Sequence, residues 1–391
     1  MQSQDFFGAD SQIHASIMRH LDRDRFEVHC AIPRDERGER CASSQAVRAV
    51  PDVHIRPTDF GPSLEQRSVG GLLRRAVPDV LPAVWSLLGL AWYVRRRRIR
   101  VVHCTEKPRD AIYGTVVAKL GGARCVIHVH VKAETWIRGS VRRAMGHACA
   151  LIGVSEFVAG SIRDLGYDPA KVTGVLNGLE LDDWHDRDVD TEAIRREFGV
   201  APGAPLIVSA SRLYRYKGQH DLLAALPDVV ARFPDLKVLI VGADDPRGHP
   251  GEERYSDVLR GLCDELDLNR NVVFTGWRSD VRELMTASDV YAMPSFEEPF
   301  GMVFTEAMHL RRPVVALNNG GTREVVEHGR SGLLSEPGDV PEIARNLLTL
   351  LDDDALRRRM GADGRRRVVE LLNSERMADD VERVYERMLA G

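Results

Sequence analysis

The sequence lacks the marks of several protein classes. No apolar run reaches the ~20 residues that a membrane-spanning helix requires, and no signal peptide opens the chain. The six cysteines lie far apart and form no CxxC pair, which argues against a disulfide framework and a cysteine-based zinc site. The basic residues are not interleaved with aromatic residues along one element, as they are in many nucleic-acid binders. We therefore expect a cytoplasmic protein that has no nucleic-acid partner.

Length and composition indicate a globular protein with more than one core. Hydrophobic residues make up 43% of the 391 residues and charged residues 29%. A chain of this length usually divides into two domains. The net charge of −4 is uneven, because residues 1–186 contain 26 Lys and Arg against 22 Asp and Glu, and the remainder contains 28 against 36. The basic half can attract an anionic acceptor or a membrane, although ordinary solvated charge produces the same balance.

Short apolar, β-branched runs alternate with amphipathic stretches of helical length along the whole chain. This pattern is typical of α/β proteins, in which helices cover both faces of a parallel sheet. We predict two Rossmann-like, doubly wound domains that face a cleft. The expected strands are residues 26–32, 53–56, 100–104, 125–130, 151–154 and 172–176 in the first half, and 206–211, 238–241, 272–275, 290–293, 314–317 and 332–334 in the second.

A polar stretch separates the two runs of alternation. Asn177 and Gly178 begin an acidic segment that continues to Asp190 and suits a domain linker. We predict an N-terminal domain over residues 1–180 and a C-terminal domain over residues 181–372. Residues 373–391 are expected to form a terminal helix that can cross back to the first domain.

The start of the chain departs from the doubly wound pattern. Such a domain begins with an apolar strand, a glycine-containing turn and a helix. Gly8 and Ala9 mark the turn and residues 13–21 the helix, but the residues before them begin MQSQD, which is too polar for a buried strand. We therefore expect the first strand to be missing from this sequence. Either the true start lies upstream, which we favour, or the sheet lacks a central strand.

The strongest chemical signal follows the predicted strand at 290–293. Residues 294–308 read PSFEEPFGMVFTEAM and place Glu298 at a carboxyl strand end, where doubly wound folds bind ligands. Phe300 and Gly301 lead into a helix that carries Glu306, and Gly301 leaves room for a ligand against the backbone. Both carboxylates can accept hydrogen bonds from the hydroxyls of a sugar nucleotide. A solvated helix start, which also favours acidic residues, is the alternative explanation.

Three further segments follow strand ends and suit the same ligand. Arg212 and Lys217 supply cations for a diphosphate after the strand at 206–211. The segment Gly320-Gly321-Thr322 opens a helix, where exposed N–H groups form an anion site. The segment Gly276-Trp277-Arg278 can cover a base with backbone groups, an aromatic ring or a guanidinium. Each segment alone is weak evidence, but four in this order favour one nucleotide-sugar site.

These motifs together resemble the donor domain of the retaining glycosyltransferase family 4, whose GT-B fold has two Rossmann-like domains. The resemblance covers about residues 206–338 and rests on SRL…KG, FTG, PS…EPFG…EA, PVVA and GG…EVV…GLL. It implies that Arg212 and Lys217 hold the donor diphosphate. It also implies that Glu306 holds the ribose hydroxyls and that Glu298 contacts the transferred sugar.

The first half resembles the family more diffusely, through VVH at 101–103, HVH at 128–130 and GVSEFV at 153–158. In the family a histidine at the end of the fifth strand faces the transferred sugar and the acceptor, which points to His130. His128 shares the same face of the strand but lies deeper, and we expect it in the core. Gly8 remains a predicted donor contact, whereas Ala9 replaces the second glycine of the family's first turn and puts close backbone approach there in doubt.

The resemblance implies a hexosyltransferase that moves a sugar from a UDP- or GDP-sugar to an acceptor and retains the anomeric configuration. The acceptor is then a glycan, a lipid-linked precursor or a small molecule, as in polysaccharide biosynthesis. The catalytic roles fall to His130, Arg212, Lys217 and Glu298, and no cofactor or metal is required. Two alternatives remain open: a sugar-nucleotide epimerase of the same fold, and a catalytically silent nucleotide-sugar-binding subunit.

An apolar run at residues 80–94 is followed at once by four arginines, Arg95 to Arg98. We expect a buried helix that the arginines cap, with Trp85, Trp92 and Tyr93 in the core of the first domain. The alternative is a helix that lies in a membrane interface, where tryptophans and arginines are favoured. In that case the protein contacts the inner face of a membrane peripherally and the acceptor is membrane-borne.

Overall fold

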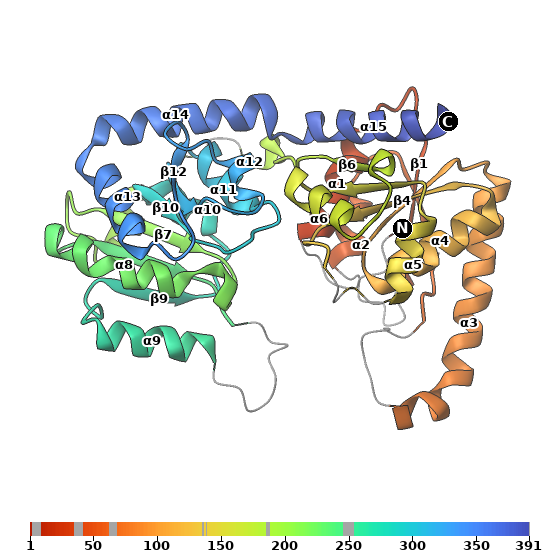
Figure 1. The fold of residues 1–391 in the computed structure, drawn as a ribbon, viewed down its shortest axis with the longest axis horizontal. Coiled ribbons are helices and arrows are strands. Elements are labelled where there is room, and N and C mark those ends of the chain that lie inside the picture. Colours follow the sequence, from red (N-terminus) through yellow and green to blue (C-terminus); the bar gives the residue numbers. More distant parts are fainter. Residues whose placement is uncertain are drawn as a thin grey trace. The chain divides into compact units, whose positions relative to one another are not determined.

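The computed structural model describes residues 1, 9–34, 42–61, 69–134, 137, 139–184, 188–244 and 254–390. The chain divides into two compact units (Figure 1). The N-terminal unit consists of Met1–Gly178 together with Ser374–Gly391, and the C-terminal unit consists of Leu179–Asn373. The last helix of the chain, α15 (Ser374–Ala390), therefore belongs to the N-terminal unit.

Helix α15 packs against α1 (Ala9–His20), although the two lie at opposite ends of the sequence. The hydroxyl of Ser16 donates to the hydroxyl of Ser374 over 2.7 Å, and the N–H of Asp22 donates to Glu382 over 2.7 Å. The buried side chains of α15 recur every three or four positions, which gives the helix one apolar face: they include Met377, Ala378, Val381, Val384, Tyr385 and Met388.

The C-terminal unit is built on one parallel sheet. Its strands are β7 (Leu206–Ala210), β8 (Lys237–Val241), β9 (Val272–Gly276), β10 (Val290–Ala292), β11 (Val314–Leu317) and β12 (Gly332–Ser335). Their order across the sheet is β12-β11-β10-β7-β8-β9. The chain therefore winds outward in both directions from β7, and β7 and β10 flank the switch point. In open α/β sheets, ligands bind outside the carboxyl strand ends at such a point.

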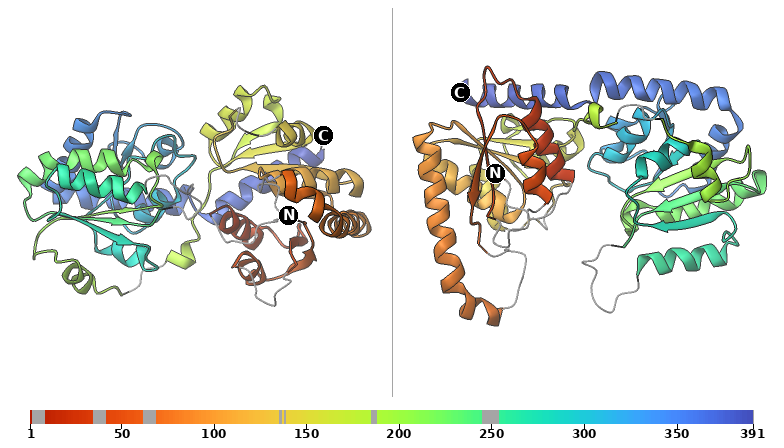
Figure 2. Two further views of the ribbon diagram at one scale, coloured as in Figure 1. Left: turned by 90° about the horizontal axis from the view of Figure 1, so that it is seen from below. Right: turned by 180° about the vertical axis from the view of Figure 1, so that it is seen from behind.

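Helices cover both faces of this sheet (Figure 2). They are α7 (Thr191–Glu197), α8 (Gln219–Arg232), α9 (Tyr255–Glu265), α10 (Val281–Ala287), α11 (Met302–His309), α12 (Thr322–Val325), α13 (Val340–Asp352) and α14 (Asp354–Leu371). Apart from the edge strand β9, the strands are buried on both sides, and one core cluster joins β7, β8 and β11 to α8 and α13. Each fully buried aliphatic side chain contributes about 1.5–3 kcal/mol, so the sheet is a rigid base for the loops that follow its strands.

The N-terminal unit contains two parallel sheets. Strand β1 (Val28–Pro33) pairs with β2 (Val53–Thr58), and β3 (Val101–Thr105), β4 (Arg124–Val129), β5 (Ala150–Gly153) and β6 (Val172–Gly174) pair in sequence order. The helices besides α1 and α15 are α2 (Ala42–Arg48), α3 (Val69–Arg96), α4 (Pro108–Gly121), α5 (Gly139–His147) and α6 (Glu156–Asp164).

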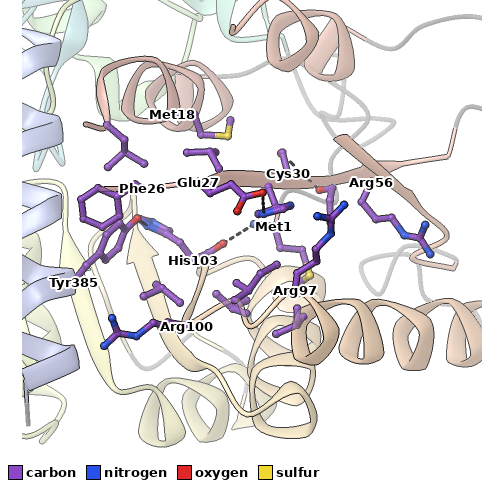
Figure 3. A pocket seen from close by; sticks show the side chains of 18 of the residues that line it. Met1, Met18, Phe26, Glu27, Cys30, Arg56, Arg97, Arg100, His103 and Tyr385 are labelled. Carbon is purple, nitrogen blue, oxygen red and sulfur yellow. Dashed lines mark hydrogen bonds and ion pairs between the residues drawn. The ribbon is translucent and has the colours of Figure 1, made fainter. Parts of the chain in front are cut away.

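A cavity of about 330 Å³ lies between the edges of β1 and β3 (Figure 3). Its lining includes Cys30 from β1, His103 from β3 and Met18 from α1. The amino group of Met1 donates to the carbonyl oxygen of His103 over 2.5 Å. In the described part of the chain no strand lies between β1 and β3, where the first strand of a doubly wound sheet belongs. The described residues therefore include no such strand, as expected, while residues 2–8, which contain the turn at Gly8, lie outside the described residues.

Helix α3 corrects one expectation. Its side chains are described from residue 81 onward, and there Ala83, Leu90 and Val94 are buried as expected. Trp85 and Trp92, however, are 71% and 61% exposed. The prediction that they lie in the core was wrong because this run is apolar all round, whereas only one face of a helix can pack on the domain. Among the described residues, no helix is both long and apolar enough to cross a membrane.

Candidate functional site

Two loops meet at the switch point of the C-terminal sheet. Strands β7 and β10 are paired neighbours, so the loops that follow them leave the same edge of the sheet. The N–H of Phe296 donates to the carbonyl oxygen of Tyr216 over 2.7 Å. Gly218 has a positive φ of 71°, and a Cβ there would collide with the carbonyl of Pro294. The close approach of these two loops therefore requires glycine at position 218.

An ion pair joins two of the predicted site residues. The ammonium of Lys217 lies 2.6 Å from Oε2 of Glu298, and both side chains are largely buried. The hydroxyl of Ser295 donates to the same carboxylate oxygen over 2.7 Å. These contacts fix a positive charge and a carboxylate side by side at the carboxyl end of β10.

The glycine pair at 320 and 321 packs directly on the loop that carries Glu298. The N–H of Gly321 donates to the carbonyl oxygen of Glu298 over 2.8 Å. A Cβ on either glycine would strike the backbone of residues 297–299, which explains why two glycines stand here. The Gly321 amide is thus engaged by protein, while the hydroxyl of Thr322 is buried without a hydrogen-bond partner among the described residues.

The beginning of α11 is shaped by packing. Phe300 is only 2% exposed and belongs to the core. Gly301 has a φ of 91°, and a Cβ there would meet the ring of Phe304. These two residues therefore aim α11 and its Glu306, and the ring of Phe300 is not presented to a ligand.

Glu306 is a half-buried carboxyl on α11. Burial raises its pKa to about 7. Within the described residues its carboxyl makes no hydrogen bond or ion pair, in contrast to that of Glu298. Tyr291 is buried nearby, and its pKa is raised by burial and by the charges of Glu306 and Glu298. A desolvated carboxyl of this kind is suited to accept hydrogen bonds from ligand hydroxyls.

The remaining predicted donor residues differ in what they offer. Arg212 is exposed, and its guanidinium lies 5.6 Å from the centre of the Tyr214 ring. Trp277 follows Gly276 at the end of β9 and is 76% exposed. The guanidinium of Arg278 is bound by Asp280 at 2.6 Å and by Glu197 at 3.0 Å. Trp277 is therefore the available flat surface of this segment.

In the N-terminal unit, His130 lies directly after β4. Its Nε2 is 3.2 Å from Nε2 of His14 on α1, and its backbone N–H donates to Glu106 over 3.3 Å. Burial lowers the pKa of His130 to about 4 and raises the pKa of Glu106 to about 7. The imidazole is therefore neutral at pH 7 and can both donate and accept one hydrogen bond.

A cluster of imidazoles surrounds His130. His14, His103 and His128 contribute rings within 5.5 Å of one another, centre to centre. His128 is fully buried, which confirms that it lies deeper than His130. Ligand nitrogens of His14, His128 and His130 all lie within 4.8 Å of one another, so these three residues are the ones among those described that can hold a metal ion.

Several residues of the two sites escaped the sequence analysis. Ser295 and Tyr216 belong to motifs already singled out, but their contacts with Glu298 and Phe296 depend on loop geometry. Glu106 lies two residues after the end of the expected strand at 100–104, and this position near a strand end was the signal that could have identified it. His14 had none, because nothing in a helical pattern places it opposite His130.

Two family models match the chain. That of the glycosyl transferases group 1 matches residues 190–367, and that of glycosyltransferase family 4 matches residues 15–183. N-acetyl-alpha-D-glucosaminyl L-malate synthase of Bacillus anthracis is 31% identical over 70% of this chain and 66% of its own length. A GDP-mannose-dependent monoacylated alpha-(1-6)-phosphatidylinositol monomannoside mannosyltransferase of Corynebacterium glutamicum is 34% identical over 74% of this chain and 77% of its own length. The D-inositol 3-phosphate glycosyltransferase of Corynebacterium efficiens is 33% identical, but the chain spans only 50% of that protein.

Solved structures share the two-domain architecture. HepE of Anabaena in complex with UDP and glucose has a TM-score of 0.75 at 22% identity, with 98% of each chain covered. WaaG, a glycosyltransferase involved in lipopolysaccharide biosynthesis, has a TM-score of 0.65 at 16% identity, with 97% of this chain and 98% of WaaG covered. At these identities the likeness establishes the fold, which is that of the GT-B enzymes.

Proposed function

Since the chain belongs to glycosyltransferase family 4, we propose that it transfers a hexose from a UDP- or GDP-sugar to an acceptor and retains the anomeric configuration. The observation that carries this proposal is the junction of Lys217, Glu298 and Gly321 at the switch point of the C-terminal sheet. Relatives support the donor class, because one is named as GDP-mannose-dependent and HepE was solved with UDP.

The donor diphosphate is assigned to Arg212 and Lys217. As the bond between the anomeric carbon and the diphosphate breaks, negative charge grows on the leaving oxygen, and cations aimed at it stabilise the transition state more than the ground state. The ammonium of Lys217 is already held by Glu298. Its positive charge is therefore in place before the donor binds, and little reorganisation accompanies the reaction.

The two glutamates have separate roles in this proposal. Glu306, whose carboxyl makes no hydrogen bond or ion pair within the described residues, accepts hydrogen bonds from the ribose hydroxyls. Glu298 holds Lys217 with one oxygen and positions a hydroxyl of the transferred sugar, and it is not proposed as a nucleophile. The exposed ring of Trp277 stacks on the base.

His130 is assigned to the transferred sugar and the acceptor. Because its imidazole is neutral at pH 7, it offers a hydrogen bond without a charge. His14 and Glu106 are positioning residues, since they contact the ring nitrogen and the backbone of His130. The acceptor is a glycan, a lipid-linked precursor or a small molecule met in the cytoplasm, and the net charge of +4 over residues 1–186 favours an anionic one.

We propose that transfer requires no metal, because Arg212 and Lys217 supply the charge at the diphosphate. Enzyme treated with EDTA should keep its turnover. A loss that Mg²⁺ or Mn²⁺ restores would contradict this assignment, whereas restoration by a transition metal alone would point to His14, His128 and His130.

The test is incubation with a panel of UDP- and GDP-sugars, selected by thermal shift, since a ligand at 100 times its Kd stabilises by about 2.7 kcal/mol. The proposal expects release of nucleoside diphosphate that depends on an added acceptor, and a product with the donor's anomeric configuration. Isomerised donor in the absence of acceptor would instead identify an epimerase. Donor binding without release in any acceptor mixture would identify a silent binding subunit.

A further inference from the structure

Helix α3 has two apolar faces. Ala83, Leu90, Ala91 and Val94 are buried in the N-terminal unit and form the face that a domain helix requires. A second set of apolar side chains points outward at intervals of three and four residues, which places them on one side of the helix. A helix that only covers a sheet carries polar residues on that side, so this second face needs another explanation.

The exposed apolar residues of the molecule gather on α3 and its packing neighbour α4. Of the thirteen large apolar side chains exposed among the described residues, seven belong to these two helices. Figure 1 shows α3 at the outer edge of the N-terminal unit, beside α4. We call the following set the α3 surface: Leu81, Val84, Trp85, Leu88 and Trp92 of α3, and Val116 and Leu120 of α4.

The charge at the end of α3 is of one sign. Arg95, Arg96, Arg97, Arg98 and Arg100 are all exposed, and none forms an ion pair with another described residue. Residues 81–105 contain no Asp or Glu. The guanidinium of Arg96 lies 5.5 Å from the centre of the Trp92 ring, so the cationic and aromatic groups are adjacent. An exposed aromatic stripe beside unpaired arginines complements an anionic surface with an apolar interior.

We propose that the α3 surface binds the anionic face of a lipid bilayer. The helix lies in the plane of the interface, its two tryptophans enter the boundary between headgroups and acyl chains, and the arginines contact lipid phosphates. With about 1.5 Å per residue, the helix can extend about 42 Å along the surface. The inference rests on the proposed function for its consequence, which is that the acceptor is a lipid-linked or membrane-borne glycan precursor.

The direct test is sedimentation of the whole protein with sucrose-loaded vesicles. At low salt, vesicles of phosphatidylcholine with 30% phosphatidylglycerol should bind the protein. Vesicles of phosphatidylcholine alone provide the reference for this binding. High salt should weaken the binding, because screening removes the arginine contribution. The double variant Arg95→Glu/Arg96→Glu should lower the partition coefficient roughly 30-fold or more, since each arginine near an anionic surface contributes about fivefold. Trp85→Ser/Trp92→Ser should lower it at least about tenfold at every salt concentration.

Matched variants in the C-terminal unit control for charge and for apolar area. Arg270→Glu/Arg359→Glu changes the same charge at exposed positions, and Val258→Ser/Val369→Ser removes exposed apolar groups. Both should leave the partition coefficient within about twofold of wild type. If the controls and the α3 variants lose binding equally, the attraction is general and the proposal is overturned.

Two further outcomes decide against the proposal. Wild-type protein that stays in solution with anionic vesicles at low salt contradicts it. A second contradicting result is a concentration-dependent dimer that Trp85→Ser abolishes, together with vesicle binding that no variant changes. The α3 surface would then be an interface between copies of the chain. Binding of UDP or GDP without vesicles is measured in parallel. If the protein binds nucleotide but not vesicles, only this inference is contradicted. If it binds vesicles but neither UDP nor GDP, the proposed function is contradicted.

Discussion

The C-terminal and N-terminal units hold their site residues in different ways. In the C-terminal unit the loops after β7, β10 and β11 are joined through backbone contacts that require glycine, as at Gly218 and Gly321. In the N-terminal unit the sheet divides at a cavity, and His130 is held by side chains, namely His14 and Glu106. The backbone contacts of the C-terminal unit hold its loops rigidly together. In the N-terminal unit the position of His130 depends on how the neighbouring neutral side chains pack.

The two sites also differ in electrostatics. The C-terminal site concentrates charge, because Lys217 and Glu298 form an ion pair with little solvent around it. The N-terminal site removes charge, because burial lowers the pKa of His130 to about 4 and raises the pKa of Glu106 to about 7. Under the proposed function, a charged site in one unit suits the donor, because charge develops on the leaving diphosphate, and a neutral site in the other unit suits the acceptor.

The largest effect should come from removing a cation of the donor site. Lys217→Ala or Arg212→Ala should lower turnover about 100-fold or more while the protein stays folded, on the scale of losing one preorganised group that stabilises developing charge. Arg215→Ala is the matched control, because this exposed cation lies in the same loop and has no assigned role. Initial rates at saturating donor measure the effect. Near-normal turnover in both Lys217→Ala and Arg212→Ala would contradict the assignment of the donor diphosphate to the C-terminal unit.

Removing the neutral group of the other site should affect turnover but not donor affinity. His130→Ala should lower turnover by up to about 100-fold, because one positioned hydrogen-bonding group is lost. The Kd for bare UDP or GDP should stay within about twofold of wild type. Exposed His147 provides the control variant His147→Ala. A parallel loss of nucleotide affinity in His130→Ala would place the histidine in the donor site instead.

The two glutamates should separate in a calorimetric titration with bare nucleoside diphosphate. Glu306→Ala should weaken binding about tenfold or more, since hydrogen bonds from ligand hydroxyls to a charged group contribute about 1.5–3 kcal/mol. Glu298→Ala should leave binding intact or tighter, because Lys217 loses its competing carboxylate, while transfer is impaired. Equal losses of nucleotide affinity in the two variants would contradict the separate assignment of Glu306 to the ribose and Glu298 to the transferred sugar.

The smallest effect concerns the pH dependence of stability. Burial holds the pKa of His128 well below its ordinary value. The unfolded chain therefore binds a proton that the folded chain does not, and stability is lost as the pH falls below about 6.5. In His128→Leu the contribution of this imidazole is absent, while those of His14, His103 and His130 remain. The difference in unfolding free energy between variant and wild type should grow between pH 7 and 5, by up to about 1.4 kcal/mol per pH unit.

Urea denaturation followed across this pH range measures the difference, with exposed His147→Leu as control.

The contribution of Glu306 in the C-terminal unit to the unfolding free energy changes with pH in the opposite direction. Because its folded pKa is raised to about 7, its contribution favours the folded state in acid and is lost as the pH rises from about 4.5 to 7. A constant difference between His128→Leu and wild type at all pH values would contradict the assigned state of the buried imidazole.

The periodicity and the turn residues of the sequence were sufficient to predict the strands of the sheets. All twelve expected strands are present, with ends within two residues of those observed. The position of Glu298 after β10 and of His130 after β4 followed from the same reasoning, because strand ends are local features. The absence of a first strand among the described residues was also expected, from the polar residues before the first turn.

Other features depend on contacts between distant residues. The pairing of Lys217 with Glu298 joins positions 81 residues apart and depends on Gly218 and Gly321 bringing the loops together. The outward face of α3 could not be predicted, because an apolar run has the same composition whether one face or all faces are buried. Arg278 was predicted to be available to a base, but its pairing with Asp280, directly before α10, and with Glu197 of α7 depends on the packing of these two helices.

The central claim is that the donor binds at the switch point of the C-terminal sheet. Hydrogen–deuterium exchange of the wild-type protein, with and without saturating UDP or GDP, tests it most directly. Exchange should slow most in residues 211–218, 294–301 and 319–323, and Lys217→Ala should reduce that protection. Slowing confined to the end of β4 around His130, or no change anywhere with either nucleotide at saturating concentration, would contradict the account.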